Sequence, residues 1–112
     1  PYTNEINQSL INYFESANIE ISDLSYLDIA SDLDIGKIDP NYLFEALVNI
    51  DLSKSDLLFI SCTALPVLSL IKDIEKKIGK IILSSNQVLI WDTLKNVNFK
   101  NKILDFGELF NN

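Results

Sequence analysis

The stretch that decides the fold is DLLFISCTALPVLSLIKDIEKKIGKIILSSN, residues 56–86. It contains two short, uninterrupted apolar runs, at 57–60 and 81–83, and each is followed by small polar residues. Such runs are typical of strands that are buried on both faces, as in a parallel sheet. We therefore predict two neighbouring parallel strands.

The residues between the two runs predict a helix. Pro66 suits a first helical turn and Gly79 suits a helix end, with Lys76 and Lys77 in the last turn, where cations complement the helix dipole. Four apolar residues recur at helical spacing: Val67, Ile71, Ile74 and Ile78. The whole stretch thus predicts a right-handed βαβ crossover, with Cys62 at the joint between the first strand and the helix.

The flanking sequence predicts more elements of the same kind. Helices are expected after Thr3, from Asp39-Pro40, and after the N-cap candidates at 84–86. Residues 19–24 alternate in polarity as a strand does, and residues 103–110 form a short apolar closing segment expected to pack on the sheet edge or on a partner.

The expected fold class is a three-layer, Rossmann-like α/β half over residues 1–112, with helices on both faces of a parallel sheet. Its strands are predicted at 19–24, 57–61 and 80–83. A doubly wound domain normally has a strand before its first helix, and none precedes that helix here. We therefore expect a gap or an exposed edge in the sheet where such a strand belongs.

Composition excludes several function classes. The chain has 112 residues, 47% of them hydrophobic, which suits one small domain. A single Cys and no His exclude multi-Cys zinc sites and the usual transition-metal clusters. The net charge of −7 and the absence of Arg argue against nucleic acid as a partner.

No run of about 18 apolar residues and no leader pattern is found, so we expect no membrane partner and a cytoplasmic location. The chain starts at Pro1 and has no Met, so we expect a fragment, a processed product or a piece of a longer reading frame.

Candidate site residues should gather at the carboxyl edge of the sheet, where parallel α/β domains bind ligands. Three joints are expected there: residues 1–3, 61–64 and 84–86. They offer hydroxyls, an amide, a thiol and free backbone N–H groups, which suit a small carboxylate. Cys62 beside a helix N-terminus would act as an acid, base or nucleophile. The alternative is that Cys62 is simply a small core residue, as lone cysteines commonly are.

These blocks resemble a known family. PYTNEIN at 1–7, LFISCTAL at 58–65 and LSSNQVLIWDTL at 83–94 are similar to the C-terminal half of the maleate cis-trans isomerase and arylmalonate decarboxylase family, within the Asp/Glu racemase superfamily. The resemblance implies two pseudo-symmetric α/β halves with the active site between them. It implies that the chain is the C-terminal catalytic half and that the N-terminal half of the same protein is a partner.

The resemblance also implies residue roles. Cys62 would be the C-terminal half's catalytic cysteine, a proton donor or acceptor at the substrate carbon. Tyr2, Thr3 and Thr63, with Ala64 beside them, would bind a carboxylate of the substrate. A further substrate contact is often found where this sequence has Ser31 and Asp32.

The resemblance leaves the reaction open. In the isomerases, a cysteine of the N-terminal half attacks the double bond while the C-terminal cysteine handles the proton; the decarboxylase needs only the C-terminal cysteine. The Thr of SCTAL is more similar to the isomerases. We expect cofactor-independent isomerase chemistry on a small dicarboxylate, without metal, in a homo-oligomer, and expect the isolated 112 residues to be inactive. Decarboxylase, racemase and a non-catalytic interaction module remain the alternatives.

Overall fold

The computed structural model describes residues 1–112. Two parallel strands, β1 (Leu57–Ile60) and β2 (Ile81–Ser84), form its sheet, in a register that runs from Leu57 opposite Ile81 to Ile60 opposite Ser84. The helices are α1 (Asn4–Ser16), α2 (Asp32–Ile35), α3 (Pro40–Val48), α4 (Ile71–Ile78) and α5 (Ser85–Asn96), with 3-10 turns η1 (Leu68–Leu70) and η2 (Glu108–Asn111). None of the helices is both long enough and apolar enough to cross a membrane.

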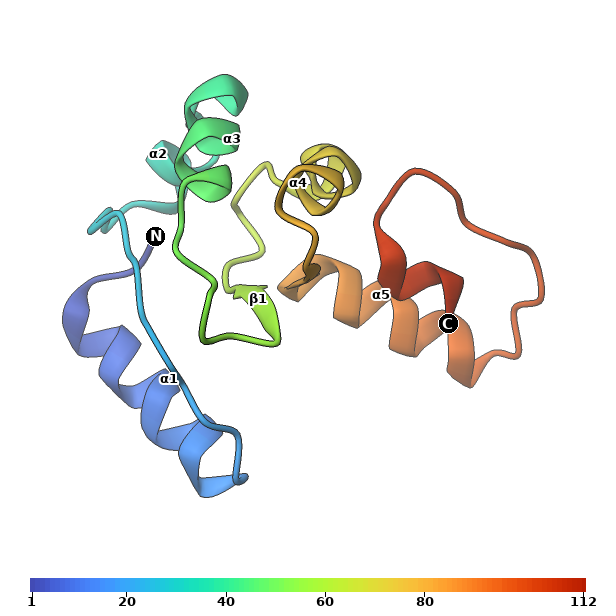
Figure 1. Ribbon diagram of the computed structural model, residues 1–112, viewed down its shortest axis with the longest axis horizontal. Helices are drawn as coiled ribbons and strands as arrows, with labels where there is room; N and C mark the ends of the chain where they lie inside the picture. Colours follow the sequence, from blue (N-terminus) through green and yellow to red (C-terminus); the bar gives the residue numbers. More distant parts are fainter.

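Helices lie on both faces of the sheet, as the apolar runs predict. Ile60 and Ile82 belong to the cluster that also contains residues of α3 and α4. On the opposite face, the Phe59 ring meets the Phe14 ring of α1 edge to face, with centroids 5.4 Å apart. Figure 1 shows α3 and α4 on one side of β1 and α1 on the other. The predicted α/β class and the βαβ crossover are therefore confirmed.

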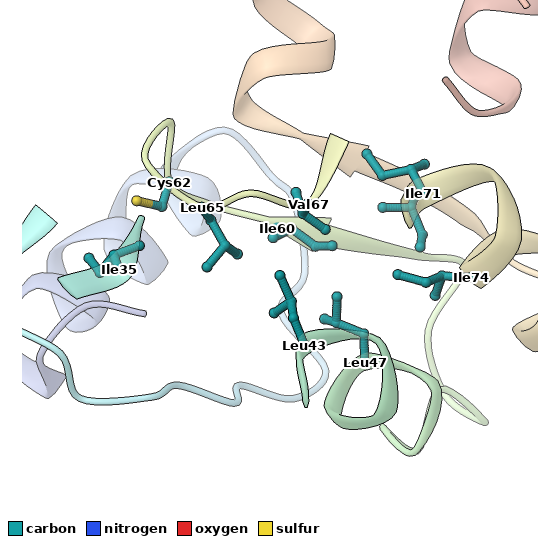
Figure 2. Packing of buried hydrophobic residues seen from close by; sticks show 10 residues of the cluster. Ile35, Leu43, Leu47, Ile60, Cys62, Leu65, Val67, Ile71 and Ile74 are labelled. Atoms are coloured by element: carbon teal, nitrogen blue, oxygen red, sulfur yellow. The ribbon is translucent and has the colours of Figure 1, made fainter. Parts of the chain in front are cut away.

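One hydrophobic cluster of ten buried residues forms the core. Figure 2 shows Leu43 and Leu47 of α3 below Ile60, with Ile74 of α4 beside them and Cys62 at the far end of the cluster. The α4 residues Ile71 and Ile74 have no exposed surface. By contrast, α1 and α5 contribute one buried residue each, Asn7 and Gln87, and both of these are polar.

The expected helix boundary after the first strand is wrong by five residues. Pro66 lies in a turn, the chain passes through η1, and α4 begins only at Ile71. The stripe itself is right, because Val67, Ile71 and Ile74 are all buried. Gly79 ends α4 in the left-handed conformation, at φ 68°, as expected of a C-terminal glycine.

The predicted strand at 19–24 is wrong. The segment has no strand partner: its amide of Ile19 bonds back to Phe14 of α1, and that of Leu24 bonds to the Asp23 carboxylate. A segment of alternating polarity forms a strand only where a neighbouring strand can pair with its backbone N–H and C=O groups. The only other strands are β1 and β2, which pair with each other, so the sheet has two strands instead of three.

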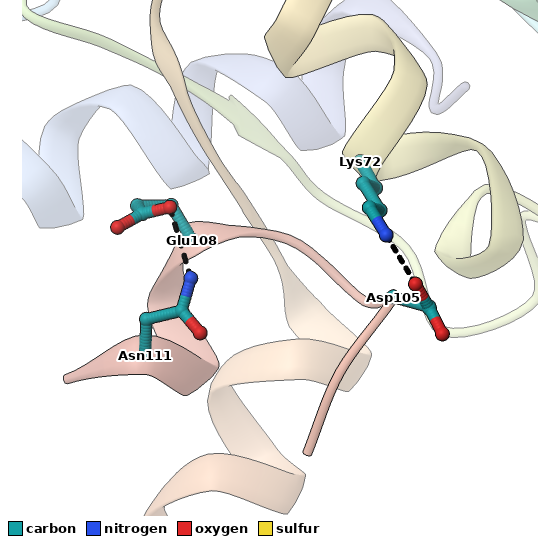
Figure 3. Close-up of polar contacts among 4 residues, drawn as sticks. All are labelled: Lys72, Asp105, Glu108 and Asn111. Carbon is teal, nitrogen blue, oxygen red and sulfur yellow. Dashed lines mark hydrogen bonds and ion pairs between the residues drawn. The ribbon is translucent and has the colours of Figure 1, made fainter. Parts of the chain in front are cut away.

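The C-terminal residues 105–112 cover the outer edge of β2 and will be called the C-terminal strap. The Glu75 carboxylate accepts hydrogen bonds from the N–H of Ile82 (2.9 Å) and from the N–H of Glu108 in the strap (2.8 Å). Figure 3 shows two further contacts, from Lys72 to Asp105 and from Asn111 to Glu108. The closing segment thus packs on the sheet edge, one of the two placements expected from the sequence.

The conformation of the strap requires a glycine at position 107. Its φ is 95°, and an added Cβ would lie 2.7 Å from both Gln87 Nε2 and Ile71 Cγ2. Because strain and overpacking add, Gly107→Ala should lower the free energy of unfolding by about 2–4 kcal/mol in urea titrations. Gly36→Ala is the matched control, since its Cβ would meet nothing closer than 3.5 Å. Equal unfolding midpoints for the two variants would contradict this account of the strap.

Candidate active site

The carboxyl ends of β1 and β2 bring the SCTAL and SSNQ blocks together. The backbone N–H of Cys62 donates to the Ser85 hydroxyl at 3.2 Å. One residue further on, the Asn86 side-chain amide donates to the carbonyl of Thr63 at 3.0 Å. Two of the three expected joints therefore meet through direct hydrogen bonds.

The N-terminal joint meets them at Tyr2. Burial raises the pKa of the Tyr2 phenol, interactions with the Cys62 thiol and the Asp32 carboxylate raise it further, and a hydrogen bond with Ser61 opposes them. Pro1 lies on the same side, and its carbonyl accepts the N–H of Ile29 at 2.8 Å. Tyr2 therefore remains a protonated phenol at neutral pH, able to donate a hydrogen bond.

Cys62 has a strained backbone. Its φ is 143°, in the region that favours glycine, although it is not a glycine. Conformations of this kind cost roughly 1–3 kcal/mol and cluster at active sites, where the surrounding structure holds them. No residue pattern announces this conformation, so sequence reasoning could not find it.

The thiol is less exposed than an open active site requires. Cys62 is only 3% exposed, whereas a proton donor in an open site would reach solvent. In Figure 2 its sulfur is at the Ile35 end of the cluster, away from Val67 and Ile71. Its cover is mixed, because Ile35 is aliphatic whereas Tyr2 is polar. Cys62 is thus at the carboxyl edge of the sheet but closed off by the N-terminal segment.

The helix N-terminus beside Cys62 belongs to α5, and the expectation that it would be the crossover helix is wrong. Ser84 is the N-cap of α5 and, with Gln87, forms a complete capping box: the Ser84 hydroxyl accepts the Gln87 N–H, and Gln87 Oε1 accepts the Ser84 N–H. The Gln87 amide also donates to the carbonyl of Phe106 in the C-terminal strap at 2.7 Å. The side chains of Ser84 and Gln87 are both buried, so this joint is held rigidly.

The other candidates lie around this centre. Thr3 is the N-cap residue of α1, but its side chain makes no capping bond. Thr63 is exposed and Ala64 is half-buried against the core. Ser31 is the N-cap residue of α2, and Asp32 begins that helix close enough to affect Tyr2. No group of three or more acidic or Cys side chains is arranged to hold a metal ion.

The arrangement of these blocks matches a family model. The model described as arylmalonate decarboxylase matches residues 1–110, almost the whole chain. The chain belongs to the arylmalonate decarboxylase family. Over 110 residues it is 30% identical to the maleate isomerase of Geobacillus stearothermophilus. The aligned region covers 97% of this chain and 44% of that protein. The chain thus spans less than half the length of the curated relatives it matches.

Solved structures of family members share the fold. The maleate cis-trans isomerase of Nocardia farcinica, bound to TRIS, superimposes with a TM-score of 0.89 at 27% identity, over 98% of this chain and 45% of that one. A crystal structure of arylmalonate decarboxylase superimposes with a TM-score of 0.84 at 22% identity, over 98% of this chain and 50% of that one. The match to about half of each protein agrees with the expected C-terminal half of the family fold.

The cover over Cys62 can be measured by alkylation, because the chain has one cysteine. Iodoacetamide should label native Cys62 slowly, and Tyr2→Ala should speed labelling at least about tenfold, since reaction with a buried group requires local opening. Tyr42→Ala is the control, because Tyr42 is 59% exposed and lies on α3. Equal labelling rates for wild type and Tyr2→Ala, measured by mass spectrometry, would show that Tyr2 does not cover the thiol.

Proposed function

We propose that this chain is the C-terminal half of a cofactor-independent enzyme that moves a proton on a small dicarboxylate, most similar to maleate cis-trans isomerase. Cys62 is its proton donor and acceptor. The observation that carries the proposal is the convergence of all three polar joints on Cys62, through Tyr2, Ser85 and the strained Cys62 backbone.

The chemistry of a relative explains why a thiol is needed here. A cysteine-to-serine mutant of the Nocardia farcinica isomerase has been solved with a covalently bound succinylcysteine intermediate. Forming a succinyl thioether from maleate makes one C–S bond and one C–H bond across the former double bond. The new C–H bond needs a proton, and product release needs a base to remove one. In this chain Cys62 supplies the proton and takes it back, while the sulfur nucleophile comes from the other half of the site.

The surrounding groups suit the substrate's charges. Tyr2 keeps its proton because its pKa is raised, so its O–H can donate to a substrate carboxylate. The N-terminus of α5, capped at Ser84, presents a positive dipole end near Cys62. Thr3 and Thr63 add hydroxyls at the same edge. We propose Tyr2, Thr3, Thr63 and Ala64 as the wall that binds the carboxylate.

Two other functions have observations in their favour. The family model is described as arylmalonate decarboxylase. Decarboxylation of an arylmalonate needs one catalytic cysteine, so Cys62 alone would be sufficient for that reaction. A non-catalytic module is favoured by the burial of Cys62 among core residues. Reading the coding sequence upstream distinguishes the decarboxylase from the isomerase. A second predicted strand followed by Cys-Thr would support an isomerase or racemase. Its absence would leave the decarboxylase or the non-catalytic module.

The isolated 112 residues should not turn over maleate, aspartate or an arylmalonate. Acid–base catalysis requires the acid and the opposing group fixed in a closed site, and fixed positioning can supply about 7–11 kcal/mol of the barrier. Absorbance and polarimetric assays of the purified chain check this. Turnover that Cys62→Ala abolishes would contradict it, and would mean that one half builds the whole site.

In the parent protein, Cys62→Ala should lower kcat by about 10²–10⁴-fold, the usual contribution of a positioned acid–base group. Thr93→Ala is the control, because Thr93 is exposed on α5 and bonds only to its own helix. Full activity in the Cys62 variant would exclude the catalytic role and favour the non-catalytic module.

A further inference from the structure

The turn that carries Cys62 is tied at both ends to the start of α5. At one end, the N–H of Cys62 donates to the Ser85 hydroxyl at 3.2 Å. At the other end, the side-chain amide of Asn86 donates to the carbonyl of Thr63 at 3.0 Å. The first bond fixes the peptide group before Cys62, and the second fixes the peptide group after Thr63. The two bonds therefore restrain every backbone rotation of the Cys62-Thr63 pair.

Cys62 needs this restraint because its φ of 143° lies in the region that favours glycine. An L-residue keeps such a conformation only where the surrounding structure holds it. None of the backbone hydrogen bonds of the turns and loops involves Cys62. Without the Ser85 hydroxyl, the N–H of a residue that is 3% exposed would lose its acceptor, and φ would be free to return to negative values.

Ser85 is itself held in place. It is the first residue of α5 and lies between the two members of the capping box, Ser84 and Gln87, which are 1% and 0% exposed. The Gln87 side chain also bonds to the carbonyl of Phe106 in the C-terminal strap. The Ser85 hydroxyl makes no other hydrogen bond within the chain, so its oxygen serves the Cys62 N–H alone. Ser85 can therefore hold the Cys62 backbone against its strain.

We propose that Ser85 and Asn86 are positioning residues, which hold the Cys62-Thr63 turn in the strained conformation that directs the thiol at the reacting carbon. The inference rests on the proposed role of Cys62 as proton donor and acceptor. Ser85 acts through the Cys62 N–H, and Asn86 acts through the Thr63 carbonyl. The aim of the thiol on β1 thus depends on side chains that lie 23 residues later, at the start of α5.

The first test is kinetic and uses the parent protein. Ser85→Ala should lower kcat by about 10–100-fold and change KM less than about threefold, because a small displacement of the catalytic group slows the chemical step and leaves substrate binding in place. Ser85→Thr keeps the hydroxyl and should recover kcat to within about threefold of wild type. Ser16→Ala is the matched control, since it removes the hydroxyl of an exposed serine that bonds only within α1.

Two further measurements make the test independent of one variant and of turnover. Asn86→Ala releases the other end of the turn from a half-buried position, and should lower kcat by about 3–10-fold with an unchanged urea midpoint. Crystal structures of the parent protein give the φ of Cys62 directly. We expect a positive φ in wild type and in Ser85→Thr, and a negative φ in Ser85→Ala.

The outcomes separate this inference from the proposed function. Wild-type kcat in Ser85→Ala, beside an inactive Cys62→Ala, would overturn the positioning role and leave the proposed function standing. An unchanged positive φ in Ser85→Ala would overturn the positioning role as well. So would a loss of activity that Ser85→Thr does not recover, or one that only follows a lower urea midpoint. If Ser85→Ala does not fold, wild-type kcat in Asn86→Ala overturns the inference. Full activity in Cys62→Ala would overturn both proposals.

Discussion

The parallel register of β1 and β2 is the constraint on which the rest of the structure depends. With Ile60 opposite Ser84, the last residues of the two strands are side by side. Cys62 and Ser85 then follow at the same edge, and the bond between the Cys62 N–H and the Ser85 hydroxyl is a direct consequence. A shift of one residue would turn Ile82 out of the core and separate the two blocks.

The surroundings of Cys62 are rigid on one side only. Gln87 and Glu75 fix β2, the start of α5 and the C-terminal strap as one unit. The opposite side has less support, because no strand pairs with β1 on the side away from β2 and α1 contributes one buried residue, Asn7. In this half Cys62 is covered by its own N-terminal segment. Under the proposed function, a substrate would have to displace Tyr2 from the thiol or bind across the phenol.

The sequence was most informative where local and long-range signals agree. Asp39-Pro40 predicts the start of α3, and the Asp39 carboxylate does accept the N–H groups of Asn41 and Tyr42. The predicted start of α4 is wrong because Pro66 is equally suited to a turn. The strand at 19–24 failed because pairing depends on a partner that a local pattern cannot supply. The φ of Cys62 and its burial are set by tertiary packing and have no signal in the sequence.

The central claim is that Cys62 reaches the reacting carbon of a dicarboxylate from the carboxyl edge of this sheet. The most direct measurement is a crystal structure of the parent protein with a bound dicarboxylate. The account predicts Cys62 Sγ within about 3.5 Å of a substrate carbon, the separation expected of groups poised to react, with the Tyr2 hydroxyl on a carboxylate. A dicarboxylate bound elsewhere, with the thiol still packed against Ile35, would contradict it.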